Sequence, residues 1–102
     1  DLALHHEPPA RTRVAIALQS GRDFGSDDLR TCLDAGWRPK LVFSGHVHRP
    51  DRRSQWVRET LCLNVAGDCR LCPPAHAILD LNTGVIERFS PQLEGVHQHP
   101  GW

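Results

Sequence analysis

An apolar run that stops at a glycine and two histidines constrains the fold of this chain more than any other feature. Residues 41–44 have the length and composition of a buried β-strand, and Gly45 marks the turn at its end. His46 and His48 follow, and residues i and i+2 of an extended segment point the same way. Neutral imidazole is the commonest transition-metal ligand near neutral pH. We therefore expect a metal centre here, with ordinary surface histidines as the alternative.

A second apolar segment repeats this arrangement near residue 1. Residues 2–6 are predicted to form a strand that ends in His5 and His6, and Pro8 and Pro9 then prevent further ladder hydrogen bonding. About 35 residues separate the two segments, which leaves room for the helical crossover that parallel strands need. If the two strands are parallel neighbours, their histidines lie along one edge of a sheet.

The two segments resemble the last two metal-binding motifs of the calcineurin-like metallophosphoesterases. The family motifs are a strand running into His-x-Pro-Pro and a later strand running into Gly-His-x-His, and their counterparts here are residues 6–9 and 45–48. Residues 61–67 and 77–86 correspond to the strand and the closing hairpin that often follow in the family. The resemblance covers residues 1–90, and three motifs in the same order make it fairly specific.

The resemblance implies metal-dependent hydrolysis of phosphoesters. His6 and His46 would bind one divalent ion and His48 the other, with His5 as the alternative to His6; the metals would be Mn, Fe, Zn or Ni. Two ions about 3.5–4 Å apart would hold a hydroxide and polarise the phosphoryl oxygens. Arg49 would bind the substrate, because arginine forks fit phosphate oxygens.

Half of the family's site has no counterpart in this sequence. Asp-x-His, Gly-Asp-x-x-Asp and Gly-Asn-His-Asp/Glu are absent, and the Gly-Asp pair at residues 67–68 lacks the second aspartate. Those motifs supply the bridging carboxylate and the acid–base histidine, so no catalytic residue is assigned here. We expect the chain to be inactive alone and to need a missing N-terminal half or another chain. The alternative is a degenerate, non-catalytic module of this fold that is kept for protein interaction.

The expected fold class is α/β, the C-terminal half of a two-sheet αββα sandwich. One α/β crossover is followed by an antiparallel β-meander, and alone this half would leave one face of its sheet uncovered. Ser26 suits a helix N-cap, and Gly36 suits the C-cap. Residues 13–18 are left open between a short helix and a strand. Further strands are predicted at residues 55–58, 60–65, 75–81 and 85–89, with a hairpin turn at residues 82–84.

Composition narrows the function classes. The 102 residues contain no methionine, which suggests a processed chain or a fragment, and the 12 basic residues balance the 12 acidic ones. This balance of charges does not indicate nucleic acid or membrane as a partner. Nucleic acid ends still belong to the phosphoesters that are possible substrates. No apolar run has transmembrane length. Cysteine usage favours a reducing cytoplasm over a secreted location.

The cysteines suggest a third, weaker hypothesis, a mononuclear zinc module that uses Cys69, Cys72 and histidines. Cys32 and Cys62 are predicted to be buried, inert thiols, in a helix and a strand. Cys69 and Cys72 form a Cys-x-x-Cys segment, which is either half of a zinc site, a redox pair or, as we favour, a loop that carries two cysteines.

The other polar residues have simpler interpretations. Residues 91–102 are expected to form an irregular tail, in which His97 and His99 are disordered or bind metal adventitiously. His76 is predicted to be structural, and Asn64 to end a strand. Three more arginines follow the second motif, and a solvated hairpin is at least as good an interpretation for them as phosphate binding: Arg52, Arg53 and Arg58.

Overall fold

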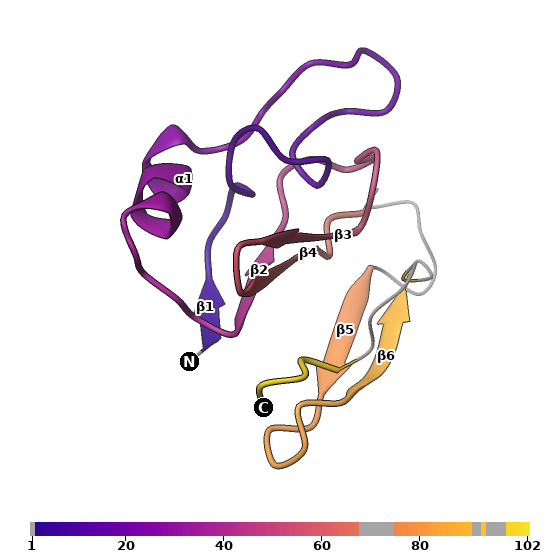
Figure 1. The fold of residues 1–102 in the computed structure, drawn as a ribbon. Coiled ribbons are helices and arrows are strands. Elements are labelled where there is room, and N and C mark those ends of the chain that lie inside the picture. Colours follow the sequence, from indigo (N-terminus) through magenta and orange to yellow (C-terminus); the bar gives the residue numbers. More distant parts are fainter. Residues whose placement is uncertain (1, 68–74, 91–92, 94–97) are drawn as a thin grey trace.

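The computed structural model describes residues 2–67, 75–90, 93 and 98–102 (Figure 1). They form a small α/β domain with one helix, a mixed sheet of four strands and a separate antiparallel hairpin. The elements are β1 (Leu2–Leu4), α1 (Asp27–Asp34), β2 (Leu41–Ser44), β3 (Ser54–Val57), β4 (Thr60–Asn64), β5 (His76–Leu79) and β6 (Ile86–Ser90).

The main sheet has the strand order β1-β2-β4-β3. β1 and β2 are parallel neighbours, with Leu4 opposite Phe43, so the predicted crossover through α1 is confirmed. β4 lies parallel to β2 on its other side and aligns Asn64 with Ser44. The carboxyl ends of β1, β2 and β4 therefore meet at one edge of the sheet, where ligands of open α/β sheets usually bind.

The predicted continuous meander is wrong. β3 forms the sheet edge and pairs only with β4 among the described strands, while β5 and β6 form their own sheet. All five side chains of β4 are buried, whereas three of the four in β3 are partly or fully exposed. A strand that is buried on both faces suits the sheet interior, and a half-exposed strand suits the edge.

Local sequence explains the helix. The Ser26 hydroxyl accepts a hydrogen bond of 3.0 Å from the amide of Leu29, as expected for an N-cap. The C-cap is Ala35 and Gly36 follows it with φ +116°, so the C-cap lies one residue earlier than the predicted Gly36. Leu29 and Leu33 are buried, but Cys32 is exposed, and the prediction of a buried thiol there is wrong.

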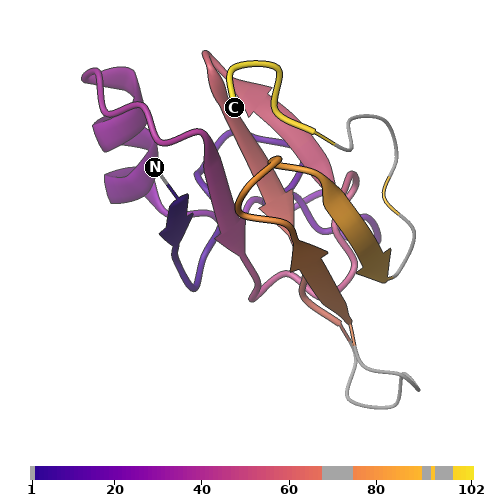
Figure 2. The same cartoon turned by 90° about the horizontal axis from the view of Figure 1, so that it is seen from below.

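Both faces of the central strands are covered, which corrects the expectation of one uncovered face. α1 and the preceding loop cover one face, and the β5–β6 hairpin with the C-terminal segment covers the other (Figure 2). Large apolar side chains remain exposed at several places instead, and Leu4 at the end of β1 is 78% exposed. The first core contains Val14, Leu29, Leu33, Val42, Val57 and Cys62, and the second contains Leu41, Leu61, Leu63, Ile86 and Leu93.

The C-terminal segment packs against the domain. His99 is 8% exposed; its Nε2 donates to the Glu59 carbonyl at 2.8 Å, and its Nδ1 accepts from the Gly101 amide at 2.9 Å. The ring also meets Trp56 edge-on, with centroids 5.1 Å apart. The prediction that His99 is disordered or binds metal is therefore wrong, because both ring nitrogens are hydrogen-bonded to backbone groups. His97 lies outside the described residues.

Candidate metal and ligand site

Parallel pairing continues past the ends of β1 and β2 and brings two histidines together. The His5 amide donates to the Phe43 carbonyl at 2.9 Å, and the Gly45 amide donates to the His6 carbonyl at 2.9 Å. These bonds extend the parallel pairing through His5 and His6 on one strand and to Gly45 on the other. His6 and His46 consequently leave the sheet at the same point.

The backbone at His46 is strained. Its φ is +65°, and the Val47 amide donates to the Gly45 carbonyl at 2.7 Å across it. This i→i+2 bond with a positive φ at the central residue is the rare, strained form of the γ-turn. A left-handed conformation costs a non-glycine residue about 1–2 kcal/mol, and such strain is concentrated at functional sites.

The imidazoles of His6 and His46 face each other. Nε2 of His6 and Nδ1 of His46 are 3.2 Å apart, and the ring centroids are 4.9 Å apart with an interplanar angle of 63°. Two nitrogens that bind one zinc ion at about 2.0–2.1 Å in tetrahedral geometry lie roughly 3.3 Å apart. The pair therefore fits two positions of one transition-metal coordination sphere. Both side chains are exposed, so an ion and a substrate can reach them.

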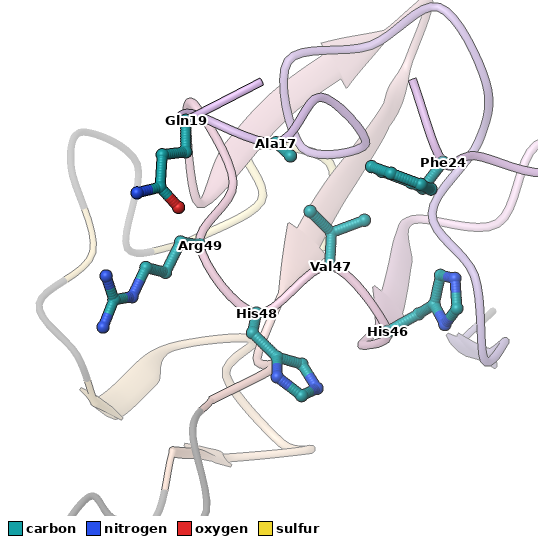
Figure 3. Close-up of a pocket in the computed structure, with 7 residues that line it drawn as sticks. All are labelled: Ala17, Gln19, Phe24, His46, Val47, His48 and Arg49. Carbon is teal, nitrogen blue, oxygen red and sulfur yellow. The ribbon is translucent and has the colours of Figure 1, made fainter. Parts of the chain in front are cut away.

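His48 and His5 do not join this pair. Within the described part of the chain, no three His, Cys, Asp or Glu side chains come close enough to hold one ion. Figure 3 shows His46 and His48 directed to different parts of the rim on either side of Val47. The same-side rule for i and i+2 requires an extended chain, and the turn at His46 breaks that geometry. His5 instead uses its Nδ1 to donate to the Glu7 carbonyl at 2.7 Å.

Asn64 holds the segment of residues 45–48, which we call the histidine loop, through side-chain hydrogen bonds. Its buried amide donates to the carbonyls of Val14 and Val47, at 2.9 and 3.0 Å, and its Oδ1 accepts from the Ala66 amide at 2.7 Å. The prediction that Asn64 ends a strand is confirmed, since β4 stops there. Its side chain additionally joins three loops, a role that nothing in the sequence indicated.

The predicted arginine cluster divides into separate roles. Arg53 donates to the carbonyls of His48, at 3.0 Å, and Ala66, so it holds the histidine loop. Arg58 lies 3.5 Å from the Asp34 carboxylate at the surface. Neither side chain is among those that line the pocket beside His46.

A pocket of about 560 Å³ adjoins His46. One wall is the segment before α1. Two hydrogen bonds join this segment to residues 49–51: the Leu18 amide donates to the Arg49 carbonyl at 2.8 Å, and the Asp51 amide donates to the Ile16 carbonyl at 2.8 Å. This wall is neither of the predicted elements for residues 13–18, but a looped segment with isolated bridges. The lining residues are Ala17, Gln19, Phe24, His46, Val47, His48 and Arg49 (Figure 3).

Sequence reasoning missed Gln19 and Phe24. Only two glycines close to them in the sequence, Gly21 and Gly25, suggested a loop, and nothing placed that loop beside the histidines. Arg49 does line the pocket, but its guanidinium extends to the side opposite His46 (Figure 3). It is therefore not positioned at the paired imidazoles.

Of the two cysteines that the structure describes, Cys32 lies at the surface and Cys62 in the core. Burial raises the pKa of the Cys62 thiol from 9.0 to about 12, with a smaller opposing effect of the Arg30 charge, so this thiol is unreactive as predicted. Cys69 and Cys72 lie outside the described residues.

Comparison with protein-family models, with curated proteins and with solved structures identifies no match for this chain. Within the described residues, no helix has both the length and the apolar character needed to cross a membrane. Function must therefore be argued from the site itself.

Proposed function

We propose that this chain supplies the C-terminal ligands of a dinuclear metal centre that hydrolyses phosphoesters. The observation that carries the proposal is the 3.2 Å approach of His6 Nε2 to His46 Nδ1 at the carboxyl ends of two parallel strands. Loop histidines without a shared role have no reason to converge from strands 40 residues apart in sequence, one of them through a strained turn.

His6 and His46 would hold one divalent ion, and His48 would contribute to the second. A bound ion of this type polarises phosphoryl oxygens and provides a hydroxide nucleophile near neutral pH. The γ-turn and the Asn64 hydrogen bonds keep the segment that carries His46 in place before an ion arrives, which limits the reorganisation that binding requires. The exposed rim leaves room for a phosphoester on the solvent side.

The bridging carboxylate and the acid–base group are not assigned within this chain. Two imidazoles can start a coordination sphere but cannot fix two ions. We expect the 102-residue chain to bind one ion at His6 and His46 and to show little or no hydrolysis by itself. The remaining ligands would come from a further segment of the protein or from another chain.

Two measurements test this proposal. Equilibrium dialysis against zinc should give one bound ion per chain, lost in His46→Ala and retained in the matched variant His99→Ala, whose ring lies elsewhere. Assays with bis-p-nitrophenyl phosphate and manganese should give no more than background turnover. Robust turnover by the isolated chain would refute the half-site argument, and equal zinc binding by both variants would refute the ligand assignment.

A non-catalytic module for protein interaction is the second candidate. It is favoured by the absence, within the described residues, of any group of three metal-binding side chains. Loss of the missing acidic motifs from any partner segment would support it. Zinc binding that depends on His6 and His46 would favour the enzyme instead.

A further inference from the structure

The pocket beside His46 has two polar ends with an apolar stretch between them. His46 lies at one end, while Gln19 and Arg49 lie at the other, and Figure 3 shows Ala17 and Val47 between the ends and Phe24 on the same side as His46. Among the residues that the structure describes, none of those lining this pocket is acidic. A ligand that fills it would therefore be elongated, apolar in the middle and anionic or hydrogen-bond accepting at both ends.

The end formed by Arg49 and Gln19 offers unengaged donors. The Arg49 guanidinium and the Gln19 amide hydrogen-bond to no other side chain or backbone group among the residues that the structure describes. Their backbone is nevertheless fixed: Arg49 accepts from Leu18 at 2.8 Å, and the Gly21 amide donates to Ala17 at 2.8 Å to close the turn that carries Gln19. Guanidinium groups form bidentate bonds with carboxylates and phosphates.

The His46 side of the pocket suits a flat ring. Phe24 is 38% exposed although its backbone is held, since its amide donates to the Ala15 carbonyl at 3.0 Å. The Arg22 guanidinium lies 5.2 Å from the ring centroid and covers part of the ring, which leaves the remainder to the pocket. Aromatic side chains that are half exposed in a pocket contact flat ligands by stacking or edge-on packing.

We infer that this pocket selects phosphoesters whose organic part is a flat aromatic group with a second anionic substituent. The phosphoryl group would lie at the His46 end, the ring against Phe24 and Val47, and the second anion at Arg49. This inference rests on the proposed function. It also changes the expected role of Arg49, which becomes a specificity residue distant from the reacting phosphoryl group. A pocket of about 560 Å³ is large enough for such a ligand.

Three non-hydrolysable probes test the inference by calorimetry in the presence of zinc: methylphosphonate, phenylphosphonate and 4-carboxyphenylphosphonate. We expect phenylphosphonate to bind about 5-fold more tightly than methylphosphonate, because of the ring contact. The added carboxylate should increase affinity about 10-fold more, because of its charge-assisted hydrogen bonds. Arg49→Gln should abolish the second increase and keep the first. Phe24→Ala should abolish the first, and Phe24→Leu, which keeps the apolar volume, should retain part of it.

The control variant is Arg58→Gln, which removes the same charge outside the pocket and should leave both ratios unchanged. Equal affinities for the two aromatic probes, or an Arg49→Gln variant that still distinguishes them, would overturn the inference. A titration with zinc alone tests the proposed function separately. If zinc does not bind, the proposed function is refuted. The affinity ratios between the three phosphonates, measured without metal, then show whether the pocket has the inferred selectivity.

Discussion

His46 and His99 both belong to His-x-His segments, yet they occupy opposite environments. The His46 ring is exposed at the end of a strand and faces His6 across 3.2 Å. His99 is 8% exposed, and backbone groups of Glu59 and Gly101 engage its two nitrogens. Short spacing alone therefore does not indicate a ligand. What distinguishes the two is whether the fold directs a ring nitrogen at a second imidazole, as at His46, or at backbone groups, as at His99.

The largest expected effect concerns Asn64, whose side chain holds the histidine loop. Asn64→Ala removes three buried hydrogen bonds and leaves the carbonyl of Val47 unsatisfied, so the free energy of unfolding should fall by about 3 kcal/mol. Urea denaturation measures it. Ser44→Ala, which removes one hydrogen bond of 3.2 Å to the Leu63 carbonyl, is the control and should cost about 1 kcal/mol. An Asn64→Ala variant more stable than the control would contradict this role.

The next effect separates the two histidine environments directly. His99→Ala should lower the free energy of unfolding by about 2 kcal/mol, because it removes two hydrogen bonds and the contact with Trp56. Its zinc affinity should not change. His6→Ala should show the reverse, with near-normal stability and lost zinc binding. Paired denaturation and dialysis of the two variants check this, and any loss of zinc binding in His99→Ala would break the comparison.

A smaller effect tests the strained turn. His46→Gly should be about 1 kcal/mol more stable than His46→Ala, because glycine adopts the φ of +65° without steric cost. At position 48, where φ is not positive, His48→Gly should be no more stable than His48→Ala. Differences in urea midpoint at equal slope measure both pairs. Equal stability of the position 46 pair would show that the turn stores no strain.

Much of this arrangement follows from the sequence, and the failures share one cause. The parallel neighbours β1 and β2, the Ser26 cap and the turn before β6 follow from local patterns. The direction of the His48 ring does not, because it depends on a turn conformation that is rare for a non-glycine residue. The pocket wall at Gln19 and Phe24 also does not follow, since loop contacts with residues 49–51 carry no periodic signal.

The smallest effect concerns the buried thiol of Cys62 in the first core. In a Cys69→Ser, Cys72→Ser background, iodoacetamide should label Cys32 rapidly and leave Cys62 unlabelled in the native state. Because burial raises the pKa of Cys62 to about 12, the native state holds this proton more tightly than the unfolded state. The stability it contributes is full below pH 9.0 and declines as the pH rises towards 12. Alkaline denaturation of Cys62→Ala gives the comparison, and labelling of native Cys62 would contradict the burial.

The paired imidazoles can be observed directly by a zinc titration followed through the ring nitrogens in long-range ¹H–¹⁵N correlation spectra. The account predicts that Nε2 of His6 and Nδ1 of His46 shift together and saturate at one equivalent, while the resonances of His99 stay in place. Shifts at His46 and His48 without His6, or no saturable shift at His6 and His46, would contradict it.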